Sequence, residues 1–527
     1  MLKGVSGRSA GKTIAVLFAL ILILSSLAVA GCAKKGGEPA RKDTLIIALG
    51  TNISTPDNHY ATGLPAIGAN SEIGDVLFRL DANGNPIPWL AKSYEWSADK
   101  KTLTLTIRDN VKMQDGKTMT SEDVRYSLDR FVKYSIGKAA LSMVTEIKAP
   151  DATHVTLTMK APFDPLVRTL AYTTITIYSK ASIDGKSKEE IASKNSPIAG
   201  PGPYKLVEFD PGDKMVLDAF PNYWAGKPQF KRVIFRMMPE MSSRIMALES
   251  GDVDLIDAIS PQEADRLAKN SKLQVLNPPA AGIVRVYLNT QKGPLADKKV
   301  RQALYYAIDR ESIVKNIFLG KAEVAHSFAP SGTFGYTGDY DVYKYDPEKA
   351  KQMLKDAGVT NLKFTVLHSP GRYILSQEVL EAMKADFAKI GVDMTIQNME
   401  WGAFSAAIKL PLKDTKMEAT LNWWRSVNGD ADNAIADYAS KYWPPGNNTP
   451  FFKNDQYDKL FDQEQSEVDT AKRGAELKEM QKILMDEVPA WVLYRQPNLW
   501  AARSDLQGVE ISALSCLQPL YKASLKK

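Results

Sequence analysis

The chain has 527 residues, of which 44% are hydrophobic, 24% charged and 9% aromatic. These fractions are ordinary for a soluble globular protein, and they exclude a disordered chain, a collagen-like repeat and a bundle of membrane helices. The formal net charge is only +6, and half of it comes from Lys3, Arg8 and Lys12, so a nucleic-acid partner is not expected. The length predicts about three domains, and two cysteines cannot form a disulfide framework.

The N-terminus has the pattern of an export signal. A basic stretch precedes the apolar run Ile14–Leu24, and small residues follow it. Residues 29–32, VAGC, resemble the lipobox of bacterial lipoproteins, in which cleavage precedes a lipidated cysteine. We therefore predict a signal peptide at residues 1–31, lipidation of Cys32 and a flexible polar tether at 32–43. A plain anchor helix or an unlipidated signal is the alternative.

Strand and helix patterns alternate along the rest of the chain. Short apolar or alternating runs predict strands at residues 44–49, 103–107 and 155–159. Capping residues followed by one-sided apolar spacing predict helices at residues 120–131, 346–358 and 376–389. The last of these helices lies between strand patterns at 364–366 and 392–396, and such a strand–helix–strand unit implies parallel pairing in an α/β domain.

Motifs for catalysis or metal binding are missing from this sequence. The four histidines have no paired spacing, which disfavours a dedicated zinc site. Residues 430–435 begin like a calcium loop but carry alanine and isoleucine where an oxygen ligand and glycine are needed. Residues 81–85, DANGN, fail the same test and predict a turn between strands. We therefore expect no enzyme, no metal and no cofactor.

Several ordered motifs carry a resemblance to one family. Residues 88–128 combine a proline-led LA, a tryptophan, alternating strand residues, Asp-Gly and an Asp-Val that enters a helix. Further matches follow in order at residues 200–204 (GPGPY), 222–226 (NYWAG), 300–310 and 345–358. This pattern resembles the peptide/nickel-type, family 5 solute-binding proteins of ABC importers. Gln114 and Val76 depart from the family pattern, at positions that we interpret as scaffold.

The resemblance implies a periplasmic-binding-protein-like α/β fold, with two lobes hinged around a cleft and an inserted third domain. Domain I would be discontinuous, domain II inserted, and the hinges would lie near Gly282 and Pro489. The implied ranges are 44–72 with 195–283 and 490–527 for domain I, 73–194 for domain II and 284–489 for domain III.

The resemblance also implies a function. The protein would be a lipid-anchored monomer in the periplasm or on the outer face of the cell membrane, without a nucleic-acid partner. It would capture a small, peptide-like solute and deliver it to an ABC permease with its ATPase subunits. A secreted hydrolase, or a peptide-handling chaperone or receptor on a similar scaffold, is the alternative.

Three loops are candidates for ligand contacts: residues 50–52 after the first predicted strand, residues 370–373 and residues 422–433. Residues 422–433, NWWRSVNGDADN, resemble the family segment in which a tryptophan precedes an acidic loop. Aromatic rings there could bury an apolar surface while charged groups fix the polar ones. Arg372 follows a predicted strand and could clamp an anion bidentately. The predicted ligand-binding residues are Trp423, Trp424, Arg425, Asp430, Asp432, Arg372, Tyr373, Thr51 and Asn52.

One position in this loop, Val427, indicates which kind of solute the protein binds. In relatives specialised for peptides, an aspartate shortly after the motif tryptophan pairs with the α-ammonium of the peptide. In this sequence the corresponding position is Val427. Valine cannot balance a buried positive charge, so a solute whose amine is absent, blocked or placed elsewhere is predicted. Trp401, Trp423 and Trp424 are expected near the cleft, where their fluorescence would report binding.

Overall fold

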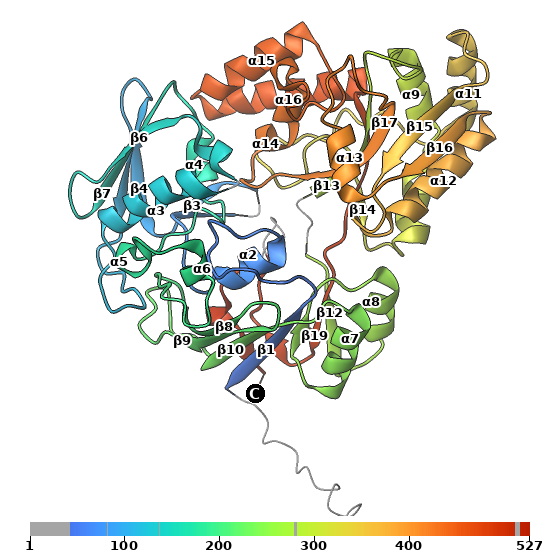
Figure 1. Cartoon of the computed structure of the whole chain (residues 1–527). Coiled ribbons are helices and arrows are strands. Elements are labelled where there is room, and N and C mark those ends of the chain that lie inside the picture. Colours follow the sequence, from blue (N-terminus) through green and yellow to red (C-terminus); the bar gives the residue numbers. More distant parts are fainter. Residues whose placement is uncertain (1–42, 82, 136, 279–281, 512–516, 527) are drawn as a thin grey trace, which may run out of the picture. The chain divides into compact units, whose positions relative to one another are not determined.

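The computed structural model describes residues 43–81, 83–135, 137–278, 282–511 and 517–526 (Figure 1). The predicted signal peptide and Cys32 lie outside these described residues, as does the other cysteine, Cys516. Residues 45–527 form one compact unit. None of the helices within the described ranges is both long and apolar enough to cross a membrane.

A mixed seven-stranded sheet contains the first strand of the described chain, in the order β12-β19-β11-β1-β10-β9-β8. Its strands are β1 (Thr44–Leu49), β8 (Tyr204–Asp210), β9 (Lys214–Ala219), β10 (Arg232–Met237), β11 (Leu255–Ile256), β12 (Leu273–Leu276) and β19 (Trp500–Arg503). Successive β1 side chains alternate between two apolar layers: Ile47 packs in one, and Ile46 packs in the other with helices α7 (Met241–Ser250) and α8 (Pro261–Leu267). The strand predicted at 44–49 is confirmed, and burial on both faces explains its unbroken apolar sequence.

A six-stranded sheet has the order β14-β18-β13-β17-β15-β16. Its strands are β13 (Gly282–Leu288), β14 (Glu323–Val324), β15 (Lys363–His368), β16 (Asp393–Asn398), β17 (Ala419–Arg425) and β18 (Ala490–Arg495). Helices that pack residues into the same apolar cluster include α9 (Lys298–Tyr306), α11 (Pro347–Asp356), α12 (Ser376–Lys389), α15 (Asp455–Ser466) and α16 (Thr470–Glu487). The predicted strand–helix–strand unit is confirmed: β15 and β16 pair in parallel, with α12 between them in sequence.

The third main sheet is four-stranded and antiparallel, in the order β4-β5-β7-β6. Its strands are β4 (Ala91–Trp96), β5 (Thr102–Ile107), β6 (Val144–Lys148) and β7 (His154–Met159), and helix α3 (Ser121–Tyr134) packs on it. The predicted cap of α3 is present, because the Thr120 N–H donates to the Asp123 carboxylate at 2.9 Å. The predicted turn at residues 81–85 joins β2 (Phe78–Leu80) to β3 (Pro86–Pro88), where the Asn85 N–H donates to Asp81 Oδ1 at 2.8 Å.

The chain passes between the two larger sheets twice. The first passage lies between β12 and β13, next to the predicted hinge at Gly282. The second differs from the prediction, which places residues 490–527 in domain I. Strand β18 pairs with β13 and β14 in the six-stranded sheet, so the chain leaves this sheet after Arg495 and not at Pro489. The division of the remaining ranges into rigid domains stays a prediction.

Gln114, one of the two departures from the family pattern, joins separate segments of the chain. Its buried side-chain amide donates to three backbone carbonyls, those of Ile73, Gly202 and Tyr204, at 2.9, 3.0 and 2.7 Å. Its Oε1 accepts from the Gly200 N–H at 3.2 Å. A buried amide that satisfies four backbone groups is a structural cross-link, and this supports the interpretation of Gln114 as scaffold.

A second buried polar cluster connects the loop after β1 to α3. Arg130 donates to His59 Nδ1 at 2.8 Å and to Asp57 Oδ2 at 2.5 Å. Arginine only donates hydrogen bonds, so Nδ1 must accept, and the Nε2–H donates to the Thr176 carbonyl at 2.9 Å. The neutral imidazole therefore satisfies both of its neighbours.

This arrangement predicts a specific dependence of stability on acidity. Burial, together with the Arg130 charge, lowers the pKa of His59 from 6.5 to about 4, against the opposing effect of Asp57. The unfolded chain then binds a proton that the folded chain excludes. The stabilisation is complete above about pH 6.5 and is lost as the pH falls towards about 4, a change of about 3 kcal/mol. We expect His59→Gln to be less stable than wild type near neutrality but to close that gap in acid. Urea unfolding across this range measures the gap, and a constant difference between the two proteins would contradict the expectation.

Candidate functional site

A cavity of about 760 Å³ lies among the described residues. Its walls come from distant parts of the chain: residues 71–89 and 171–176, residues 323–333 with Ser426, Gly429 and Arg495, and residues 510–519. This volume is in the range of cavities that hold small organic molecules. Charged groups line it on several sides, namely Asp75, Arg79, Asp81, Glu323, Arg495 and Glu510. We refer to it as the main cavity.

One wall of the main cavity is built around Trp89. The Arg79 guanidinium carbon lies 3.6 Å from the centre of the Trp89 ring. The Trp224 ring packs edge-on against the same indole, with the two ring centres 4.7 Å apart, and Arg108 Nε donates to the Trp89 carbonyl at 2.6 Å. Asp75 lies 3.5 Å from Arg79 and accepts from the Tyr223 hydroxyl at 2.9 Å. The wall therefore presents an indole and a guanidinium that their neighbours hold in place.

Another part of the lining lies at the end of β18. Arg495 Nη1 donates to Glu323 Oε2 at 2.8 Å and to Ser331 Oγ at 2.5 Å. The Arg495 side chain is only 8% exposed, whereas that of Glu323 is 60% exposed. Since the guanidinium binds a carboxylate of its own wall, this wall is close to neutral in charge.

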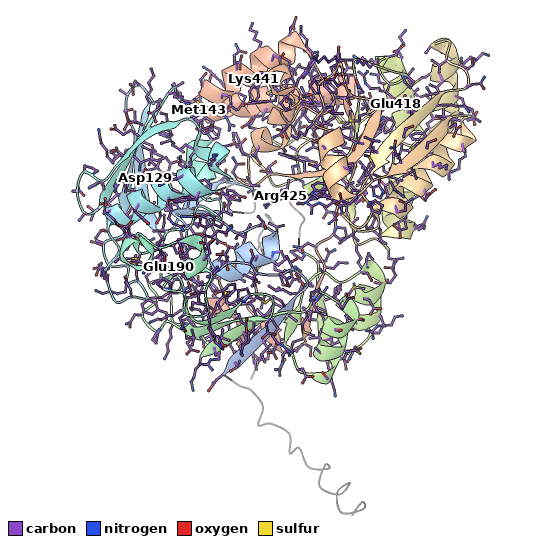
Figure 2. All side chains as sticks on the ribbon, in the orientation of Figure 1. Asp129, Met143, Glu190, Glu418, Arg425 and Lys441 are labelled. Carbon is purple, nitrogen blue, oxygen red and sulfur yellow. The ribbon has the colours of Figure 1, made fainter. Side chains whose placement is uncertain are left out.

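The loop after β17 contributes to the main cavity, but through residues that were not singled out in the sequence. Ser426 and Gly429 line the cavity, and Trp423, Trp424 and Arg425 do not. Both tryptophans pack against the apolar core of the six-stranded sheet, and Trp424 Nε1 donates to the Asn433 carbonyl at 2.9 Å. Arg425, labelled in Figure 2, is half-buried at the end of β17.

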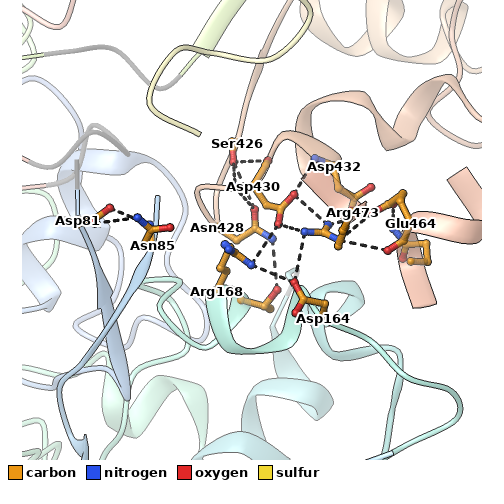
Figure 3. A network of polar contacts seen from close by, with 12 residues as sticks. Asp81, Asn85, Asp164, Arg168, Ser426, Asn428, Asp430, Asp432, Glu464 and Arg473 are labelled. Atoms are coloured by element: carbon orange, nitrogen blue, oxygen red, sulfur yellow. Dashed lines mark hydrogen bonds and ion pairs between the residues drawn. The ribbon is translucent and has the colours of Figure 1, made fainter. Parts of the chain in front are cut away.

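Asp430 is held in a buried network of charges (Figure 3). Arg473, on α16, forks onto its carboxylate at 2.7 and 3.1 Å, and neither side chain is exposed. Arg473 also pairs with Glu464 on α15 at 3.0 Å. Arg168 on helix α4 (Leu166–Thr169) and Asp164 shortly before this helix complete the network: Arg168 pairs with Asp164 at 3.1 Å and lies 4.0 Å from Asp430. The network thus joins the segment around α4 to α15 and α16.

The network contains more carboxylates than guanidinium groups, and this raises proton affinity within it. Burial and the neighbouring Asp430 raise the pKa of Asp432, and burial with Asp432 raises the pKa of Glu464 well above its usual range. Asp430 and Asp432 are not in the lining of the main cavity. Their prediction as ligand contacts stays a prediction, and in this structure the Asp430 carboxylate already binds Arg473.

Arg372 lies at a second hollow, of about 690 Å³, beyond the carboxyl ends of the parallel strands β15 and β16. This second hollow is lined by residues 369–372 and 398–401. The Arg372 guanidinium carbon lies 4.4 Å above the Trp401 ring, so this site repeats the arginine-on-tryptophan arrangement of the main cavity. Tyr373 points elsewhere and donates to Asn422 Oδ1 at 2.9 Å. Thr51 and Asn52 are exposed and line neither hollow.

Comparison with known proteins assigns the fold to a family. The model of bacterial extracellular solute-binding proteins, family 5 middle, matches residues 85–455. The glutathione-binding protein GsiB of Escherichia coli K12 is 29% identical over 476 residues, which cover 88% of this chain and 91% of that protein. The dipeptide-binding protein of the same strain is 28% identical over 459 residues, which cover 81% of this chain and 84% of that protein. DppA of Helicobacter pylori, solved in complex with the peptide STSA, has a TM-score of 0.74 at 25% identity, covering 92% of this chain and 98% of its own.

The chain belongs to family 5 of the extracellular solute-binding proteins. The fold class expected from the sequence is confirmed, and so is the general function, that of a solute-binding component of ABC importers. Its relatives are binding proteins and not enzymes.

The wall residues of this family 5 protein that lie in residues 71–89 were not predicted from the sequence as ligand contacts. Trp89 stands inside the motif of residues 88–128 and Arg79 stands shortly before it, and this motif identified the family without singling out a ligand contact. Val76, the other departure from the family pattern, also lines the main cavity. The departure at Val76, close to the matched motif, was the signal in the sequence that could have indicated this wall of the cavity. Within the described residues, no three histidine, cysteine, aspartate or glutamate side chains gather as metal ligands would.

Proposed function

We propose that this protein captures a peptide-like solute in the main cavity and delivers it to an ABC permease. The observation that carries the proposal is the position of the cavity, whose lining joins residues 71–89, near the seven- and four-stranded sheets, to residues of the six-stranded sheet. In this proposal the two passages of the chain between the larger sheets act as hinges. Solute binding would then close the cavity and reduce the radius of gyration in solution scattering.

The surroundings of Val427 support a restricted choice of solute. Val427 is half-buried, and its N–H donates to Asn433 Oδ1 at 2.9 Å. The next carboxylate along the loop, Asp430, is paired with Arg473 and would have to break that pair to reach a solute. We infer a solute whose amine is absent, blocked or placed away from this loop. The relatives named for glutathione and for dipeptides define the compounds to compare.

Calorimetry against unmodified dipeptides, their N-acetylated forms and glutathione tests this proposal. We expect N-acetylated peptides or glutathione to bind more tightly than unmodified dipeptides. Tight binding of unmodified dipeptides that acetylation abolishes would show that the inference from Val427 is wrong. Recovery of each compound chemically unchanged separates a binding protein from the alternative of a secreted hydrolase. A chaperone or receptor would bind loosely and would not need a permease.

We also propose that the mature protein is anchored through lipid on Cys32, on the outer side of the cytoplasmic membrane or in the periplasm, and that it acts as a monomer. The support is the VAGC sequence after an apolar run and the polar segment that follows it. Globomycin treatment, or Cys32→Ser, should cause an unprocessed precursor to accumulate. Normal maturation in both cases would overturn the lipoprotein proposal without affecting the proposal for the cavity.

A further inference from the structure

We propose that Arg79, whose guanidinium lies over the Trp89 ring, binds a carboxylate of the solute in the main cavity. The inference rests on the proposed function, because it assigns a chemical group of the captured solute to one wall residue. Arg79 and Trp89 both line the cavity, and the Arg79 side chain is 16% exposed. The guanidinium is thus largely withdrawn from water but still open to the cavity.

The hydrogen-bonding capacity of Arg79 is mostly unused within the protein. A guanidinium has five N–H donors. Among the described residues, Arg79 makes one polar contact, a long one of 3.5 Å from Nη2 to Asp75 Oδ1. Asp75 itself is occupied by better partners, since Oδ2 accepts from Tyr223 at 2.9 Å and Oδ1 from the Val76 N–H at 3.0 Å. Asp75 therefore supplies a compensating charge while it engages only Nη2 of Arg79, at 3.5 Å.

Other buried arginines of this chain are arranged differently. Arg473 forks onto Asp430 at 2.7 and 3.1 Å, and Arg310 reaches both oxygens of Asp341 at 3.0 Å. Arg495, which also lines the main cavity, is paired with Glu323 at 2.8 Å. The Arg79 guanidinium instead lies with its face over the Trp89 ring and has no close carboxylate partner among the described residues. Stacking fixes the plane of a guanidinium and leaves its N–H groups at the edge, where a carboxylate can bind bidentately.

The rest of the wall keeps this geometry in place before any solute arrives. Trp224 packs edge-on against Trp89, and Arg108 both bonds the Trp89 carbonyl and lies 4.7 Å above the Trp224 ring. A side chain that is fixed in its bound orientation loses little conformational freedom when the ligand binds. Asp81, the other carboxylate of residues 71–89 that lines the cavity, accepts from Asn83 and Asn85 of its own loop.

The test compares peptides as free acids with the same peptides as C-terminal carboxamides. Calorimetry uses a panel of unmodified and N-acetylated dipeptides in both forms, on wild type, Arg79→Met, Arg79→Lys and the surface control Arg266→Met. Wild type and Arg266→Met should prefer the acid roughly tenfold to a hundredfold, as expected for a charge-assisted hydrogen-bonded pair. Arg79→Met should bind acid and amide equally, and Arg79→Lys should show a smaller preference than wild type. Circular dichroism establishes that each variant is folded, and Arg79→Lys retains the charge if Arg79→Met does not fold.

The possible results separate two failures. If wild type binds neither form of any peptide, the proposed peptide-like solute is wrong and this inference is overturned with it. If wild type binds peptides but does not distinguish acid from amide, or if Arg79→Met keeps the full preference, the inference alone is overturned. Arg372→Met is measured in the same panel. If Arg79→Met keeps the preference for the acid and Arg372→Met loses it, the carboxylate binds in the second hollow and the inference is overturned.

Discussion

Replacing Arg473 with methionine should lower the free energy of unfolding by about 3–5 kcal/mol at neutral pH, the range for breaking a buried ion pair by removing one partner. Methionine fills a similar volume, so the loss is electrostatic in origin. Arg473 is fully buried and binds both Asp430 and Glu464. Without it, Arg168 is the only cation of the network and lies 4.0 Å from Asp430. Urea unfolding of the mature protein measures the loss.

The same variant should show a characteristic pH dependence. Arg473 lowers the pKa values of Asp432 and Glu464, against the larger raising effect of burial. Its removal raises both pKa values further in the folded state. A raised carboxyl pKa contributes stability that is present in acid and lost as the pH rises, so the deficit of Arg473→Met should shrink towards about pH 4.

Arg266→Met is the matched control for this prediction. Arg266 also pairs with two carboxylates, those of Glu249 and Glu263 at 2.7 and 2.6 Å, but its side chain is 47% exposed. Exposed pairs of this kind contribute at most about 1 kcal/mol because water and salt screen them. Equal losses in the two variants would show that burial does not make the Arg473 network important for stability.

The elements that could be predicted from sequence are those whose signal is local. The helix cap at Thr120 and Asp123 and the alternation in β5 and β7 depend on residues within a few positions of each other. The assignment of β18 to a sheet depends instead on its pairing with β13, about 200 residues earlier in the chain. A proline before a strand indicates where the strand can begin, but it does not indicate which sheet the strand joins.

The candidate site illustrates the same limit at the level of side chains. The loop after β17 was singled out as a candidate region, and two of its residues, Ser426 and Gly429, line the main cavity. The partner of Asp430 could not be read from that loop, because Arg473 lies 43 residues further along the chain. An acidic residue in a loop has the same sequence pattern whether it faces a solute or a buried arginine. The partner that folding brings to it decides between the two.

The response of tryptophan fluorescence to solute should come mainly from Trp89. Of the nine tryptophans, Trp89 lines the main cavity and Trp401 lines the second hollow, whereas Trp423 and Trp424 pack against the core. A solute in the main cavity would contact the Trp89 indole. Its carboxylate would also partly neutralise the charge of the Arg79 guanidinium, whose carbon lies 3.6 Å from the centre of the Trp89 ring. Trp89→Phe should therefore remove most of the fluorescence change that wild type shows at saturating solute.

Trp401→Phe is the informative comparison, because Trp401 also carries a stacked arginine, with Arg372 4.4 Å above its ring. Its fluorescence response should remain close to that of wild type if the solute occupies the main cavity. Each titration must reach saturation, since Trp89→Phe also weakens the support of Arg79 and so lowers affinity. The opposite outcome, a full response in Trp89→Phe and a lost one in Trp401→Phe, would place the solute at the carboxyl ends of β15 and β16. The capture site would then be the second hollow, where Arg372 follows the parallel strand β15.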